Sequence, residues 1–431
     1  MRLDNRGQIL GYAVISLLLI LGMAGLALDG GFYWEGRRRA QNAADAAALA
    51  GAWELTRNPT PNYSAAALAG ATQNGFTNDS STTVTPYRCS DAGSSCGAYA
   101  GNSKFVEAVV SRNESTMLLG ALGITSMSPA ARAVAGPETT PICVQALDGS
   151  DAQSILAGTS TLNMPGCAML VNSSAGNALQ LSNTTVTAQT IQVVGSDSIT
   201  GGSVSPTPQT GTIPVTDPFA TLAAPPPSPP YVCTSTNKIC SGLSCTGANA
   251  LSPGVYCQGI TVASATVTFN AGAYILLGGG MSVIGSTSVL QTAAGAGVTF
   301  YNTTDASHAT NKAISISGGS SVTLHACDGS SYSCGPSSNA AIPGILFFQA
   351  SSNTVAATIA GPTTMNLTGV MYFPAAKVTY SGGSGTLPTP GPNSCTEIVA
   401  NQVSFSGNAA LASNCSSFPN GATISTVALA E

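Results

Sequence analysis

Charged residues are scarce in this sequence. Asp, Glu, Lys and Arg make up 7% of the 431 residues, against roughly 25% in an average soluble domain. The 13 basic residues are too few to form the basic surface that follows a nucleic-acid backbone, and a coiled coil needs charged positions beside its apolar seam. Disordered chains combine low hydrophobicity with high net charge, whereas this one is 44% hydrophobic with a net charge of −5. We expect a folded chain with no nucleic-acid partner.

Residues that usually perform chemistry are also few. His308 and His325 are the only histidines and no CxxC pair occurs, so no set of four zinc ligands has the usual spacing. No P-loop, dinucleotide motif or Ser-His-Asp set is recognisable. Asp148 and Asp151 resemble part of a metal-adhesion motif, but the motif fails at its third ligand, where position 152 is Ala. We predict that the protein is not an enzyme and has no cofactor or metal.

Cysteine, by contrast, is abundant and falls into short local groups. An even number of cysteines, here 12, is typical of disulfide-bonded proteins in an oxidising compartment. The spacing predicts four pairs: Cys89 with Cys96, Cys143 with Cys167, Cys327 with Cys334, and Cys395 with Cys415. A middle group leaves three pairings open: Cys233, Cys240, Cys245 and Cys257.

The one long uncharged apolar run covers residues 9–28, which is enough to cross a bilayer as a helix. A cleaved signal peptide is the alternative, with residues 25–27 as its cleavage site, but its apolar core is usually shorter. Aromatic residues followed by arginines are typical of a retained anchor. The residues that we assign to the anchor are Ile9, Leu17, Leu18, Leu19, Leu28, Phe32, Tyr33, Trp34, Arg37, Arg38 and Arg39. The cysteines downstream favour a cytoplasmic N-terminus.

An alanine-rich stretch, residues 37–53, extends the predicted helix beyond the membrane, because alanine is the best helix former. The stretch is either a plain solvated helix or a close-packing one. In the second case Ala43, Ala47 and Ala50 would form a small-residue face that another backbone can approach. Such a long helix is common in pilin-like subunits.

A motif surrounds this helix. Its residues are Arg6, Gly7, Gln8, Asp29, Gln41, Asn42, Ala43, Ala44, Asp45, Ala46 and Ala47. Over about the first 55 residues the sequence resembles TadG-like proteins of the bacterial Tad (Flp, tight-adherence) pilus assembly system. In related pseudopilins a peptidase cuts after a Gly and needs a Glu at the fifth mature position. If Gly7 were that Gly, the fifth residue would be Tyr12, which favours a permanent anchor.

The resemblance implies a structural component of pilus assembly, single-pass in the inner membrane, with a cytoplasmic N-terminus and a periplasmic or surface-exposed C-terminal region. Its partners would be other Tad/Flp pilus proteins or pilin-like helices, and cell-envelope or surface polymers. A surface adhesin or minor pilin is one alternative, and a carbohydrate-active β-helix enzyme is a second. The resemblance also implies a small α+β, pilin-like region at residues 56–137, with a short helix near residues 65–76 and a strand–helix–strand finish.

From residue 138 onward the composition changes. Only three basic residues and nine acidic residues occur between 138 and 431. A short pattern of apolar residue, small residue and Gly or Asn recurs there, with Gly158 and Asn183, and Gly382 and Gly407, each 25 positions apart. Members of the pattern begin at Leu156, Leu181, Val283, Ile316, Ile359, Tyr380 and Phe405.

A unit of 20–25 residues cannot bury its apolar face alone, but stacked units can. The pattern therefore predicts an all-β region, folded as a right-handed parallel β-helix and stapled by disulfides. Its alternative is a β-sandwich, in which hairpin turns would join neighbouring strands. We predict three regions: anchor and extended helix at 1–55, the α+β region at 56–137, and the β-helix at 138–431. A proline-rich insertion at 204–231 interrupts the last, as a semi-rigid loop or as a ligand for a partner.

Overall fold

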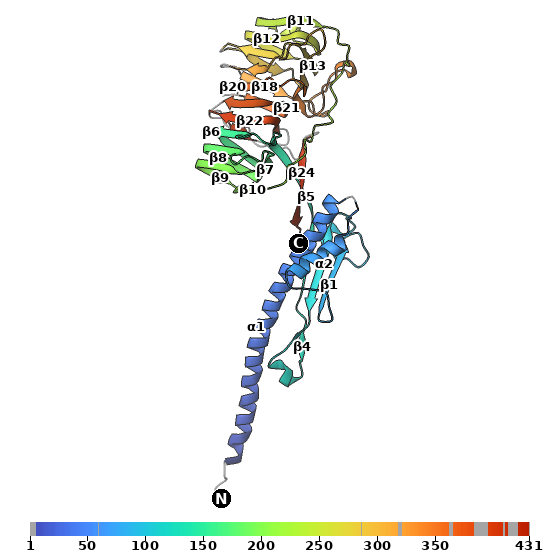
Figure 1. Cartoon of the computed structure of the whole chain (residues 1–431), viewed down its shortest axis with the longest axis vertical. Coiled ribbons are helices and arrows are strands. Elements are labelled where there is room, and N and C mark those ends of the chain that lie inside the picture. Colours follow the sequence, from blue (N-terminus) through green and yellow to red (C-terminus); the bar gives the residue numbers. More distant parts are fainter. Residues whose placement is uncertain are drawn as a thin grey trace. The chain divides into compact units, whose positions relative to one another are not determined.

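The structure is a computed structural model that describes residues 6–58, 60–285, 287–317, 321–361, 365–382, 395–407, 410–412 and 421–430 (Figure 1). The chain divides into two compact units. The first comprises Met1–Thr139 together with Ser425–Glu431, and the second comprises Thr140–Ile424. The return of the C-terminal residues to the first unit was not foreseen from the sequence.

A single long helix dominates the first unit. Helix α1 runs from Arg6 to Arg57, 52 residues without interruption, which corresponds to about 78 Å at the usual rise. Leucine-rich sequence in its first half and alanine-rich sequence in its second half both favour helix, and no proline occurs before Pro59. The predicted extension of the anchor beyond residue 28 is therefore continuous with the anchor itself.

A short helix and an antiparallel sheet complete this unit. Helix α2 (Tyr63–Gln73) begins where the Asn62 side chain accepts a hydrogen bond from the Ala65 N–H, at 3.1 Å. In the sheet, β2 (Val106–Arg112) lies between β1 (Thr82–Arg88) and the first part of β5 (Ala130–Ala146). The core lies between the helices and the sheet, and alanines from α1 make up much of it.

A narrow hairpin leaves the sheet between β2 and β5. Its two short strands, β3 (Glu114–Ser115) and β4 (Ser126–Met127), pair antiparallel. The 3₁₀ turn η2 (Leu119–Leu122) forms its tip. The resemblance implied a strand–helix–strand finish for this region, and the structure forms only this single turn in place of the helix, because Gly123 ends it at φ 90°.

The second unit is made almost entirely of strands. After β5 they are β6 (Ile155–Gly158), β7 (Thr161–Val171), β8 (Leu179–Val193), β9 (Asp197–Ser205), β10 (Gln209–Thr210), β11 (Ser235–Cys245), β12 (Gly254–Phe269), β13 (Gly272–Leu277), β14 (Met281–Ile284), β15 (Val289–Thr292), β16 (Val298–Thr303), β17 (Ile314–Ile316), β18 (Ser321–His325), β19 (Ile345–Gln349), β20 (Ala357–Gly361), β21 (Met365–Gly382), β22 (Thr396–Ser406), β23 (Ala410–Ala412) and β24 (Thr423–Leu429). The short 3₁₀ turns η3 (Gly247–Asn249) and η4 (Ser337–Asn339) lie between these strands. The turn η1 (Gly97–Tyr99) and most of β24 belong to the first unit.

Six of the seven recurring apolar residues of the sequence pattern lie in one column of stacked residues. Each is the register partner of the next along parallel strands, and all but the last are buried. The column runs through Cys240, Val262, Val283, Ile316, Ile359, Tyr380, Phe405, Ala157, Leu181 and Ile199. The repeat that was visible in the sequence therefore identifies a physical row of the core.

The first copy of the pattern is displaced by one residue from its predicted start. The register places Ala157, and not Leu156, opposite Leu181. Leu156 is only half-buried whereas Ala157 is fully buried, because successive residues of a strand face opposite sides. The left-handed position that follows is Thr159, at φ 48°, which matches Asn183 at φ 49°.

The order of the strands in space differs from their order in the sequence. The chain enters in the middle of the stack with β5–β7 and proceeds through β8 to β9 and β10 at one end. It then resumes at β11, at the other end, and winds back to β22 (Figure 1). There Val403 pairs with Ile155, which joins the last-wound strands to the first.

Parallel ladders close into a circuit of eight strands, which runs β12–β13–β16–β19–β21–β20–β17–β14 and back to β12. The prediction that this unit is built of strands is confirmed, and its strands form a closed parallel barrel. All the pairings described within this unit are parallel, unlike the hairpins that the β-sandwich alternative requires. The right-handed β-helix stays a prediction.

The proline-rich insertion covers one outer face of the stack. Gln145 and Asn172 donate to the Val215 carbonyl, at 3.1 and 2.7 Å. Phe219 packs on Tyr372 with ring centroids 5.2 Å apart. Together with Leu222 and Tyr231, this segment covers a second apolar layer on the outside of the strands. Residues 211–231 thus lead from one end of the stack toward the other as a strap, which is closer to the predicted loop than to a free proline ligand. The predicted insertion began too early, because residues 204–205 and 209–210 lie in β9 and β10.

Candidate functional site

The first half of α1 presents an apolar surface that the chain itself does not cover. Among the described residues, α1 is the one helix that is long and apolar enough to cross a membrane, by length and composition. Leu17, Leu19 and Leu28 are 57%, 62% and 52% exposed. The side chains of the other anchor and motif residues at this end lie outside the described part: Arg6, Gly7, Gln8, Ile9 and Leu18.

Aromatic and basic residues follow this surface on the next turns of α1. Phe32 and Trp34 are more than half exposed, and the Tyr33 ring packs edge-on against Trp34. The Arg37 guanidinium lies 5.6 Å from the centre of the Trp34 ring, and Arg39 Nε bonds Glu35 Oε1 at 3.0 Å. Arg38 is exposed. Rings of this kind, backed by cations, suit the boundary between lipid and water.

Asp29, one of the motif residues, has a structural role that the sequence did not indicate. Its carboxylate is 1% exposed and accepts three backbone N–H groups from the hairpin, those of Met117, Leu118 and Leu119, at 2.8, 2.9 and 2.7 Å. Charge-assisted hydrogen bonds from backbone donors offset the loss of water around a buried carboxylate. Asp29 therefore fixes the hairpin tip against α1.

The alanine face of α1 is used inside its own unit. Ala43, Ala44 and Ala47 are fully buried, and a Cβ added at Gly70 of α2 would lie 2.7 Å from the Ala46 carbonyl oxygen. The small residues thus permit close approach of a backbone, which is the second of the two alternatives that the sequence left open, and that backbone is α2 of the same chain. Ala50 is half-buried beside this contact.

The polar residues of the motif lie beside this face. Gln41 Nε2 donates to Asp45 Oδ1, at 2.7 Å, and to the Arg132 carbonyl of β5, at 3.1 Å. The bond to β5 ties the helix to the edge strand of the sheet. Asn42 is exposed on the opposite side and is the one member of the QNAAD string whose side chain points to solvent.

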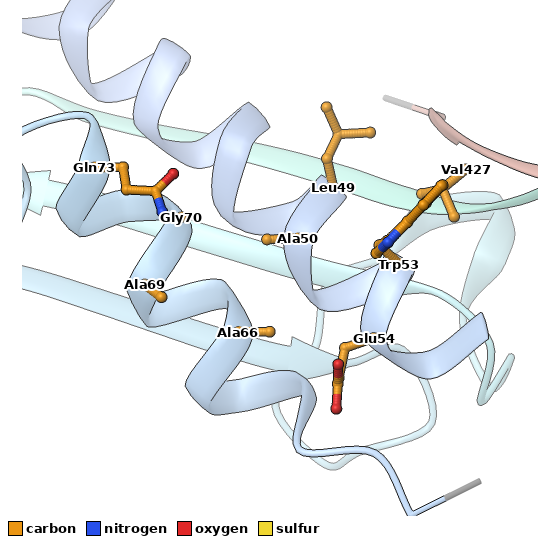
Figure 2. A pocket seen from close by; sticks show the side chains of 9 residues that line it. All are labelled: Leu49, Ala50, Trp53, Glu54, Ala66, Ala69, Gly70, Gln73 and Val427. Atoms are coloured by element: carbon orange, nitrogen blue, oxygen red, sulfur yellow. The ribbon is translucent and has the colours of Figure 1, made fainter. Parts of the chain in front are cut away.

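A groove of about 490 Å³ lies on the surface between α1 and α2. Figure 2 shows its lining: Leu49, Ala50, Trp53 and Glu54 from α1, Ala66, Ala69, Gly70 and Gln73 from α2, and Val427 from β24. The lining is mostly apolar, and the Glu54 carboxylate lies at one end, where it accepts a hydrogen bond from Asn58 Nδ2 at 2.8 Å. Sequence reasoning missed this groove, because Val427 is remote in the chain.

Residues 7–54 match the family model described as putative Flp pilus-assembly TadE/G-like. The match covers nearly all of α1 and confirms the resemblance to TadG-like proteins over this segment. No curated protein and no solved structure matches the chain. Asp29 and the buried alanines all lie within the TadE/G-like segment, which also supplies one wall of the groove.

Outside the TadE/G-like segment, the structure joins most of the cysteines in pairs. Five disulfides are described: Cys89–Cys96, Cys143–Cys167, Cys233–Cys257, Cys240–Cys245 and Cys327–Cys334. The middle group thus adopts one of its three possible pairings. The predicted bond between Cys395 and Cys415 cannot be placed, because Cys415 lies outside the described residues.

The described part of the chain contains one cluster of possible metal ligands, and two of its three members form a disulfide. The ligand atoms of Cys233, Cys257 and His308 lie within 4.8 Å of one another. The two sulfurs are bonded to each other, so neither can act as the thiolate that binds a metal. His308 instead contacts Asp305, with Nδ1 and Oδ1 3.0 Å apart.

The remaining polar residues that the sequence singled out have structural surroundings. The His325 ring stacks on Tyr332 with centroids 4.3 Å apart, and burial lowers its pKa. Asp148 Oδ1 accepts the N–H groups of Ser150 and Asp151, at 2.8 and 2.6 Å, within its own turn.

Glu397, which sequence reasoning did not single out, is fully buried. Burial raises its pKa well above the usual value, and its Oε2 accepts the Ala422 N–H at 3.1 Å. Burial at this position therefore disfavours the charged form of the carboxyl group.

Proposed function

We propose that this chain is a structural, non-enzymatic component of Tad/Flp pilus assembly, anchored in the bacterial inner membrane by α1. The TadE/G-like match at residues 7–54 is the observation that carries the proposal. The exposed leucines and the aromatic and basic residues that follow them support α1 as the anchor. The cysteine pairs support a cytoplasmic N-terminus with both folded units outside the cytoplasm, because disulfides persist in oxidising compartments.

The strand-rich unit would be a right-handed parallel β-helix that mediates contacts with proteins or envelope polymers. Its support is the register, in which partners such as Ile260 and Met281, or Val378 and Val403, are one sequence period apart. A row of buried apolar residues at this spacing is what stacked coils require. Neutral hydroxyl and amide side chains on the outside would interact with polar surfaces without net charge.

Chromosomal deletion tests the assignment. We expect the deletion strain to lose most of its pili and its surface adhesion, and the full-length gene supplied in trans to restore both. The control plasmid carries the same gene with its initiator codon changed, so that the RNA is made but the protein is not. Unchanged pilus number and adhesion in the deletion strain would overturn the proposal.

A surface adhesin or minor pilin is the second candidate. Strand β9 favours it, because its residues lie almost wholly exposed at one end of the stack and are mainly Ser, Thr and Gly. Fractionation separates the two candidates: recovery with sheared pili supports the adhesin, and recovery in the inner membrane supports the assembly component.

A further inference from the structure

The hairpin between β3 and β4 carries an apolar tip that the described residues of the unit cover only in part. Residues 116–124 read TMLLGALGI, and no charged residue occurs between Glu114 and Arg132. Met117 is 71% exposed and Ile124 is 49% exposed. An uncharged tip with exposed large side chains is unfavourable in water, so its environment requires explanation.

The hairpin runs alongside α1 toward the membrane end of that helix (Figure 1). At its base, a Cβ added to Gly36 would lie 2.9 Å from Pro129 Cγ. At its tip, a Cβ added to Gly25 would lie 3.2 Å from Leu119 Cδ2. These two glycines are separated by about 16 Å along the helix. The hairpin thus passes the level of Phe32 and Trp34 and reaches the last turn of the apolar run.

The backbone of the tip has few unpaired donors. The Asp29 carboxylate accepts the N–H groups of Met117, Leu118 and Leu119. Within the tip, the N–H groups of Ala121, Gly123 and Ile124 donate to carbonyls of residues 118–120, at 3.1 Å each. Irregular backbone can enter hydrocarbon only when its polar groups are satisfied within the protein, and this arrangement meets that condition for most of the donors.

We propose that the hairpin inserts its tip, residues 117–124, into the lipid leaflet beside α1 and forms a second membrane contact. The partner is the acyl region of the bilayer, argued from the continuity of the tip with the exposed face of α1, where Met23 and Leu26 are 64% and 70% exposed. Asp29 is the positioning residue. This inference rests on the proposed membrane span of α1.

The test uses the full-length chain in vesicles of phosphatidylethanolamine and phosphatidylglycerol. Four variants each carry one added cysteine: Met117→Cys, Ile124→Cys, Leu26→Cys and Ser103→Cys. An environment-sensitive fluorophore (NBD) is attached to that cysteine. The unsubstituted chain is treated in the same way and measures how much label the native cysteines take up. Ser103 is exposed in a loop of the same unit, and Leu26 reports the span itself. Quenching by nitroxide-labelled acyl chains measures contact with lipid.

We expect quenching at positions 117 and 124 to be comparable to that at 26 and several-fold above that at 103. Quenching at 26 without quenching at 117 and 124 would overturn the inference and leave the anchor intact. No quenching at any position would overturn the membrane span as well. Equal quenching at 103 would mean that the unit lies flat on the membrane, which also contradicts an inserted tip.

Two further variants test the role of Asp29. Asp29→Ala removes the acceptor of the three N–H groups, so quenching at 117 should fall several-fold while quenching at 26 stays unchanged. Asp45→Ala removes a carboxylate from the same helix without touching the hairpin, and it should alter neither signal. Unchanged quenching at 117 in Asp29→Ala would contradict the positioning role.

Discussion

Tyr372 of β21 donates its hydroxyl proton to Asp217 Oδ2 at 2.7 Å and so fastens the strap, residues 211–231, to the face that it covers. Burial, with the nearby Asp217 carboxylate, raises the pKa of Tyr372, so the hydroxyl stays a donor at physiological pH. The bond joins residues that are far apart in the sequence and closes the strap over the outer apolar layer.

Replacing Tyr372 by Phe keeps the ring packing on Phe219 and removes only this bond. We expect the free energy of unfolding to fall by about 1.5–3 kcal/mol, as for a hydrogen bond to a charged group. Chemical denaturation of the full-length chain in detergent measures the change. Tyr301→Phe, which alters a ring of the same cluster, is the control and should change stability by less than about 1 kcal/mol. Equal effects of the two variants would contradict a specific role for the bond.

Two disulfides of the same region offer a matched comparison. Cys233 and Cys257 are separated by 24 residues and Cys240 and Cys245 by 5. Because a longer closed loop restricts the unfolded chain more, removal by paired Cys→Ala substitution should cost about 3 kcal/mol for the first bond and about 2 kcal/mol for the second. Denaturation midpoints under non-reducing conditions test the order, and a larger loss from the short loop would refute the argument.

Gly70 lies where α2 approaches α1 most closely. In Gly70→Ala the new Cβ would lie 2.7 Å from the Ala46 carbonyl oxygen, so the helices must separate. We expect a loss of about 1–3 kcal/mol, although alanine is the better helix former. Ala65→Ser alters an exposed residue of the same helix and should stay within about 0.5 kcal/mol of the parent. A stabilised Gly70→Ala variant would show that the contact is looser than described.

His325 should make stability depend on pH. Burial lowers its pKa below the ordinary 6.5, so the unfolded chain takes up a proton at higher pH than the folded chain does. The stabilisation is therefore complete above pH 6.5 and is lost as the pH falls through the lowered pKa. His325→Phe keeps a ring that can stack on Tyr332 and cannot titrate.

Thermal unfolding of the parent and of His325→Phe at about pH 5 to 7.5 measures how the stability of each protein depends on pH. This range brackets the ordinary pKa of histidine. We expect the melting temperature of the parent to fall more steeply with acid than that of His325→Phe, because His308 and the carboxyl groups are common to both. Parallel slopes would show that His325 contributes nothing to the pH dependence.

Local features of the sequence predicted the long helix and the regular spacing of the strands. An uninterrupted apolar and alanine-rich stretch is sufficient to predict α1, because helix formation depends on neighbouring residues. The recurring triplets predicted strands at a regular spacing, and the register places residues such as Ile359, Tyr380 and Phe405 in one row. Even so, the first triplet was set one residue early, since an apolar side chain at Leu156 looks the same whether it faces inward or outward.

The position of the motif on α1 was also visible in the sequence, but the function of its residues was not. Asp29 could have been any polar residue near a membrane boundary. Its role depends on Met117–Leu119, which the hairpin brings to it from almost ninety positions away in the chain. In the same way, the alanines allowed either a solvated helix or a close backbone contact, and the sequence did not indicate that α2 makes this contact.

What the sequence alone determined is therefore the composition of each unit: the long apolar helix, the neutral strands, their spacing and the cysteine pairs that lie close together. The tertiary structure decided which strands are neighbours. The strand-rich unit begins in the middle of its stack of strands and proceeds to one end. The strap then leads to the other end, and the following strands return until Val403 pairs with Ile155. A sequence period specifies the partner strand one period ahead, because that partner is local. The pairing of the first strands with the last ones depends on which exposed strand edges remain to be covered, and only the folded chain determines that.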